Sequence, residues 1–137
     1  MTRRDFERLV ARAIHMIPDE FLRRVDNLSF QIEDWADAET LNEAGLRDPR
    51  DLLGHYRGCP LPERTHQYQD LADVITIYQQ AVEDCHRRTG TGLLRIVGET
   101  VLHELAHYFG FDEEAMDEIE QWWQRTDGDG IGGPGDS

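Results

Sequence analysis

The chain has 137 residues, of which 39% are hydrophobic and 31% charged, and its net charge is −14. One domain is expected from this length. The acidic net charge does not suit a nucleic-acid-binding protein, because such binding requires cationic side chains. No apolar run approaches the roughly 18 residues of a membrane span. The N-terminus lacks the apolar stretch of a secretion signal, and the two cysteines form no CxxC pair, so we expect a cytoplasmic, monomeric protein with reduced thiols.

The first half of the chain predicts one long helix, one short helix and one strand. Residues 3–16 carry apolar side chains at three- and four-residue spacing, which indicates an amphipathic helix that Pro18 ends. A short helix is expected over 18–25, because proline and acidic residues open it. Residues 27–35 alternate between apolar and polar side chains, which is typical of a half-buried strand. The polar segment 36–51 predicts a loop with at most one helical turn.

The second half adds two strands and the longest helix, and the whole is an α+β domain over 1–125. The expected elements are strands over 52–58 and 72–79, helices over 80–88 and 93–109, and a last helix that begins at 112 or 113. Residues 59–70 contain prolines that predict an extended loop, and Gly110 ends the long helix. The glycine-rich segment 126–137 predicts a disordered tail.

The motif HELAH, at 103–107, indicates a metal site on the long helix. His103 and His107 lie four residues apart and therefore share one helix face, where two imidazole nitrogens can bind Zn²⁺. Glu104 is rotated by about 100° from His103. It can therefore reach a water at the metal and act as the general base of a metallopeptidase.

The third metal ligand is expected among the acidic residues that follow Gly110. Glu113 has the favoured spacing, ten residues after the first histidine, and Asp112 is the alternative. More distant candidates are Glu118, Glu120 or a water. Glu99 lies one turn before His103. It is expected either to orient a metal ligand by contacting that ligand and not the metal, or to be a solvated helix residue.

Other polar residues of the middle segment are candidates for contacting substrate. Tyr56, Arg57 and Arg64 could donate a hydrogen bond to the oxyanion that forms during peptide hydrolysis, although such residues are also common structural elements. The remaining histidines have no metal-ligand spacing and are interpreted as structural or surface residues: His15, His55, His66 and His86.

Several blocks in order resemble the small, single-domain zincin-like metallopeptidases of bacteria. The blocks are LLGHYRGCPLPER at 52–64, ADVITIYQQ at 72–80 and VLHELAHYFGFDEE at 101–114. The resemblance implies a minimal α+β fold, in which a short, about three-stranded sheet lies beside the active-site helix. It also implies zinc held by two histidines and an acid. Here Glu113 stands where that family usually has aspartate, and Tyr108 where it often has histidine.

Two functions follow from these patterns. The first is a zinc-dependent metallopeptidase that hydrolyses a peptide or protein substrate, with Glu104 as general base. The alternative is a metal-stabilised binding or regulatory module with weak or no peptidase activity. From Asp112 onward the chain has nine acidic residues and one arginine, so this acidic C-terminal segment would bind a basic partner.

Overall fold

The computed structural model describes residues 1–58 and 73–111, together with 114, 117 and 121. Its centre is a mixed three-stranded sheet in the order β1-β3-β2, formed by β1 (Leu28–Glu33), β3 (Asp73–Tyr78) and β2 (Gly54–Arg57). The central strand β3 runs parallel to β1 and antiparallel to β2. Among the described strands, the short strand β2 therefore forms one edge of the sheet.

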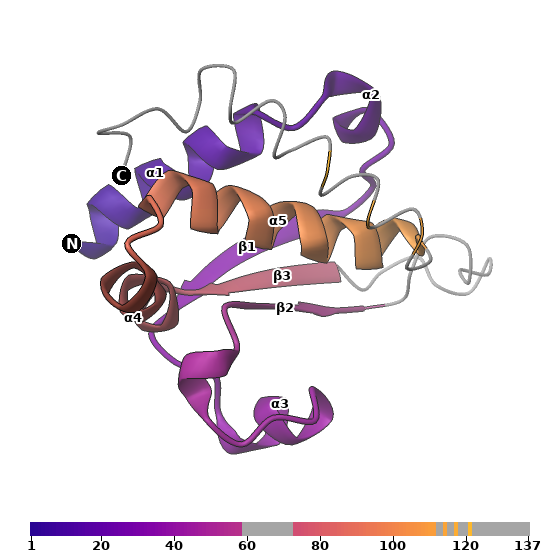
Figure 1. The fold of residues 1–137 in the computed structure, drawn as a ribbon. Helices are drawn as coiled ribbons and strands as arrows, with labels where there is room; N and C mark the ends of the chain where they lie inside the picture. The colour runs from indigo at the N-terminus through magenta and orange to yellow at the C-terminus, as the bar shows by residue number, and fades with distance from the viewer. Residues whose placement is uncertain (59–72, 112–113, 115–116, 118–120, 122–137) are drawn as a thin grey trace.

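Two helices cover one face of this sheet, α1 (Arg3–His15) and α5 (Leu93–Phe109) (Figure 1). Thr2 caps the start of helix α1, because its hydroxyl accepts from the Asp5 N–H at 3.1 Å. The apolar faces of both helices pack with Ile75 and Ile77 of β3, which are fully buried. The core thus lies between the helices and the sheet, and it holds α5 in a fixed position beside β2.

The predicted elements of the first half are confirmed, with one difference at 36–51. The short helix is α2 (Asp19–Leu22), and β1 alternates between partly buried and exposed residues as expected. The segment predicted as a loop contains helix α3 (Ala38–Glu43) and the 3₁₀ helix η1 (Pro49–Asp51). The Asp37 carboxylate accepts from the Thr40 N–H at 2.8 Å, and this cap starts α3 despite its polar sequence.

In the second half, β3 is followed directly by α4 (Gln79–Thr89) and then by α5. Gly110 ends α5 in the left-handed conformation, with φ of 73° and ψ of 28°, as the sequence predicted. Beyond it, the Phe111 N–H donates to the Ala106 carbonyl at 2.9 Å, which closes the last turn.

The α+β class and the three-stranded sheet beside the long helix are confirmed. The extended loop at 59–70, the tail at 126–137 and most of the expected last helix lie outside the described residues. In the part of the chain that the structure describes, no helix is long and apolar enough to cross a membrane.

Candidate active site

Helix α5 brings His103 and His107 together as the sequence predicted. Their Nε2 atoms lie 3.2 Å apart, and their rings are nearly perpendicular, at 81°. Two nitrogens bound tetrahedrally to one Zn²⁺ at about 2.0–2.1 Å would be separated by roughly 3.3 Å. The pair therefore has the spacing that two ligands of one zinc ion require.

The electrostatics of His107 also suit a metal ligand. Partial desolvation lowers its pKa, and the neighbouring His103 and His55 lower it further. A lowered pKa keeps the imidazole neutral near pH 7, which is the form that binds a metal. Within the described residues, no third His, Cys, Asp or Glu completes a metal-binding group with this pair.

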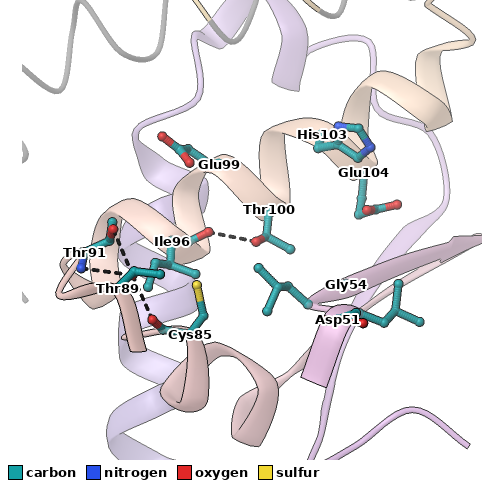
Figure 2. A pocket seen from close by; sticks show the side chains of 12 residues that line it. Asp51, Gly54, Cys85, Thr89, Thr91, Ile96, Glu99, Thr100, His103 and Glu104 are labelled. Atoms are coloured by element: carbon teal, nitrogen blue, oxygen red, sulfur yellow. Dashed lines mark hydrogen bonds between the residues drawn. The ribbon is translucent and has the colours of Figure 1, made fainter. Parts of the chain in front are cut away.

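Glu104 points toward β2, as Figure 2 shows, and is only 8% exposed. Burial raises the pKa of this carboxyl to about 7, against the opposing effects of His103 and of a hydrogen bond from the Tyr56 backbone N–H. Helix α5 therefore presents one half-buried and one exposed histidine, with one carboxyl in a protected position beside them. This is the arrangement expected of a general base adjacent to a metal.

Close approach of β2 to α5 depends on Gly54. A Cβ atom at this position would lie 2.6 Å from Thr100 Cγ2 and 3.4 Å from Glu104 Cγ. Only glycine leaves room for the Thr100 methyl at this distance. The absence of a side chain on Gly54 thus allows β2 to pack closely against the part of α5 that carries Glu104.

A cleft runs along α5 on both sides of His103 and Glu104. One arm, here called the α4–α5 pocket, has a volume of about 410 Å³ and includes Leu52, Leu53, Cys85, Thr89, Ile96 and Thr100 in its walls. Figure 2 shows this arm between α5, α4 and the segment that leads into β2. The other arm, here called the α3-side pocket, has a volume of about 460 Å³ and includes Ala44, Leu46, His55, Tyr56 and His107. A chain lying in this cleft would pass the two histidines and Glu104.

His55 is a residue of the cleft that sequence reasoning missed. Its spacing in the sequence indicates a structural or surface residue, but the structure places it in the α3-side pocket with His103 and His107. Its Nε2 lies 3.6 Å from Glu43 Oε2, while desolvation and Arg57 lower its pKa. No local spacing could have revealed this position, because it results from the pairing of β2 with β3.

Tyr56 lines the same pocket, but its hydroxyl is directed to the core. It donates to Asp73 Oδ2 at 2.5 Å, and its ring packs edge-on against Tyr108 with a centroid separation of 5.9 Å. Asp73 is fully buried at the start of β3. An oxyanion role for the Tyr56 hydroxyl stays a prediction, and it would require this hydrogen bond to break.

The other candidates of the sequence fall in three groups. Arg57 donates to Thr40 at 3.2 Å and pairs with Glu43 at 3.3 Å, so it contacts α3. Glu99 accepts from Arg95 Nε at 3.2 Å, and a role in orienting a ligand stays a prediction. Five candidates lie outside the described residues: Arg64, Asp112, Glu113, Glu118 and Glu120.

Comparison with known families agrees with this geometry. The family described as zincin-like metallopeptidase matches residues 25–123, which include all three strands and the whole of α5. The chain belongs to the zincin-like metallopeptidase family. A search of curated proteins gives no match.

A metal is the group that zincin-like metallopeptidases require, and the residues of this chain fit it. The two Nε2 atoms converge at 3.2 Å, and the nearby Glu104 carboxyl is buried with a raised pKa. A cation beside this carboxyl would stabilise its ionised form. Imidazole nitrogens are among the ligands that Zn²⁺ prefers.

Proposed function

We propose that this zincin-like protein is a zinc-dependent peptidase in which His103 and His107 bind the metal and Glu104 is the general base. The observation that carries the proposal is the pair of Nε2 atoms 3.2 Å apart, with a buried carboxyl on the adjacent position of the same helix. The third ligand in this proposal is Glu113, with Asp112 as the alternative.

A bound Zn²⁺ would polarise the substrate carbonyl and make an attacking water more acidic. Glu104 then accepts a proton from the water and donates it to the amine that leaves. The Tyr56 backbone N–H holds the Glu104 carboxyl in place, and burial keeps this carboxyl apart from bulk water.

The substrate in this proposal is an extended peptide. Strand β2 is at the edge of the sheet among the described strands, and an edge strand can pair with a peptide backbone. The cleft passes His103 and Glu104 along this strand and continues on both sides. This continuity supports a substrate that extends in both directions from the hydrolysed bond.

The test combines zinc binding with hydrolysis of a peptide library. We expect about one zinc per chain, hydrolysis that a chelator abolishes, and loss of zinc in His103→Ala. Glu104→Gln should retain zinc but lose about 10²–10⁴-fold in rate, which is the usual contribution of a general base. Glu7→Gln is the matched control, since Glu7 is exposed on α1, and it should behave like the wild type.

Two results would overturn the proposal. If Glu104→Gln hydrolysed every cleaved peptide at the wild-type rate, Glu104 would not be the base. If the zinc-loaded wild type cleaved nothing in the library, the binding or regulatory module would be favoured. Capture of a basic partner that survives Glu104→Gln but is lost when Glu118 and Glu120 are neutralised would then support that alternative.

A further inference from the structure

Tyr56 of β2 contacts the proposed general base through its backbone and is fixed in place through its side chain. Its backbone N–H donates to the Glu104 carboxyl. Its hydroxyl donates to Asp73 Oδ2 at 2.5 Å, and its ring packs edge-on against Tyr108, with the ring centroids 5.9 Å apart. The N–H that holds Glu104 therefore belongs to a residue whose hydroxyl and ring both contact fully buried side chains.

Asp73 supports the Tyr56 hydroxyl from the central strand, because it is fully buried at the start of β3. Its own N–H donates to the Asn27 carbonyl at 3.0 Å. A Cβ atom on Gly58, the residue after β2, would overlap the Asp73 carboxyl, so the end of β2 packs directly on this carboxyl. Burial of a carboxyl is costly unless it is hydrogen-bonded, and an aspartate here therefore favours a role for its hydrogen bond over a role in packing.

Tyr108 supports the ring of Tyr56 from the active-site helix. It follows His107 directly on α5 and is fully buried. Its hydroxyl donates to the Asp26 carbonyl at 2.7 Å and accepts from the Asp26 N–H at 2.7 Å. Because these two hydrogen bonds fix Tyr108, the surface on which the Tyr56 ring packs is itself held in one position.

We propose that Asp73 is a positioning residue for the general base. By holding the Tyr56 hydroxyl, it keeps the Tyr56 N–H on the Glu104 carboxyl and so fixes this carboxyl beside the two histidines. A displacement of about 1 Å at a reacting group can lower the rate by up to about 10²-fold, so a buried hydrogen bond can affect the reaction without contacting the substrate. This inference rests on the proposed peptidase function and adds Asp73 and the Tyr56 side chain to the residues on which it depends.

The experiment compares variants of the full, zinc-loaded chain, each with Glu104 and with Glu104→Gln. Tyr56→Phe removes the hydroxyl and keeps the ring, whereas Asp73→Ala removes the acceptor of its hydrogen bond. Asp73→Asn keeps an oxygen that can accept this bond. Thr2→Ala is the matched control, because it removes the cap of α1 and so lowers stability away from the site. Urea titration confirms that every variant is folded under the assay conditions, and Tyr56→Phe remains as the test if Asp73→Ala does not fold.

We expect Tyr56→Phe and Asp73→Ala to lower kcat by about tenfold to 10²-fold, with KM and the zinc content little changed. Asp73→Asn should recover most of this loss, and Thr2→Ala should leave kcat unchanged although its urea midpoint falls. In the Glu104→Gln background, Tyr56→Phe should change the residual rate by less than about twofold, because residues that act as a unit are not additive. A purely structural role of Asp73 would lower the rate equally in both backgrounds.

Hydrogen exchange of the Tyr56 amide, followed by NMR, measures the positioning without hydrolysis. In Asp73→Ala this amide should exchange about tenfold or more faster than in the wild type, because it opens locally once the side chain is released. The amides of Ile75 and Ile77, which are fully buried in β3, report global opening. They should change in Asp73→Ala only as far as its lower stability requires, which is calibrated with Thr2→Ala.

Two results would overturn the positioning role: an unchanged kcat in Tyr56→Phe, or a loss of equal size in the Glu104→Gln background. The second result would favour the Tyr56 hydroxyl as a donor to the oxyanion. The exchange measurement separates this inference from the peptidase proposal. Faster exchange of the Tyr56 amide in Asp73→Ala, in a protein that cleaves nothing, would keep the positioning of Glu104 and refute the peptidase, whereas cleavage with unchanged exchange would refute the positioning alone.

Discussion

The most direct test of how the fold positions the site is Gly54→Ala. The new methyl group would lie 2.6 Å from Thr100 Cγ2, whereas ordinary contact begins at 3.4 Å. Strand β2 and helix α5 must therefore separate by roughly 0.8 Å, or Thr100 must leave its rotamer. The backbone conformation itself tolerates alanine, because Gly54 does not have a positive φ.

The magnitude follows from two opposing effects. Overpacking of this kind costs about 1–3 kcal/mol, while a Gly→Ala change stabilises by about 0.4–1 kcal/mol through the unfolded chain. We expect a net loss of about 1–2 kcal/mol in the free energy of unfolding, measured by urea titration. Displacement of Glu104 by nearly 1 Å should also reduce peptide hydrolysis by up to about 10²-fold, with zinc binding retained.

A second substitution isolates the cause. Thr100→Ser removes the Cγ2 methyl and keeps the hydroxyl that donates to the Ile96 carbonyl. In the Gly54→Ala background it should restore stability, which gives a coupling free energy of about 1 kcal/mol or more in a double-mutant cycle. If Gly54→Ala were neutral, or if Thr100→Ser failed to rescue it, the close approach of β2 and α5 would not be what requires glycine.

Three further predictions concern stability. In metal-free protein, the pKa of Glu104 is about 7, against 4.5 when unfolded, so the free energy of unfolding of the wild type should fall by up to about 3 kcal/mol as pH rises from 4.5 to 8. Glu104→Gln should lack this loss. Urea titrations in which the free energy of unfolding fell equally for both proteins would contradict the prediction. Asp73→Ala leaves the Tyr56 hydroxyl without its acceptor and should destabilise the protein by about 2 kcal/mol or more, whereas Asp73→Asn should destabilise it by less. Equal urea midpoints for the wild type and Asp73→Ala would refute the contribution of the Tyr56–Asp73 hydrogen bond. Gly110→Ala places alanine at φ of 73° and should cost about 1 kcal/mol, measured by thermal melting, whereas an unchanged midpoint would argue against the left-handed cap.

The parts of the fold that the sequence could predict are those that depend on local patterns. The apolar spacing of α1, the alternation in β1 and the end of α5 at Gly110 all arise from residues within one element. The histidine pair belongs to this class, because a four-residue spacing on a helix places two side chains on one face. These features therefore appeared in the structure where they were expected.

The remaining features depend on contacts between elements. His55 enters the cleft because β2 pairs with β3 at the edge of the sheet, and Asp73 is buried because β3 is the central strand. Periodicity does not determine strand order, so neither position could be predicted. Helix α3 is longer than the single helical turn expected over 36–51, because Asp37 caps a segment too polar to show an apolar period.

Strand order also explains how one helix provides both metal ligands and a desolvated base. Glu104 could be exposed if α5 faced solvent on that side, and its pKa would then stay near its usual value. Because β2 lies directly against α5 through Gly54, Glu104 is largely buried at the floor of the cleft, while His103 and His107 are more exposed beside it. The Tyr56 N–H that holds Glu104 belongs to the same strand, and the Tyr56 hydroxyl is held by Asp73 of β3. Strand β2 is thus the element that buries the Glu104 carboxyl of the HExxH motif and leaves the two histidines accessible.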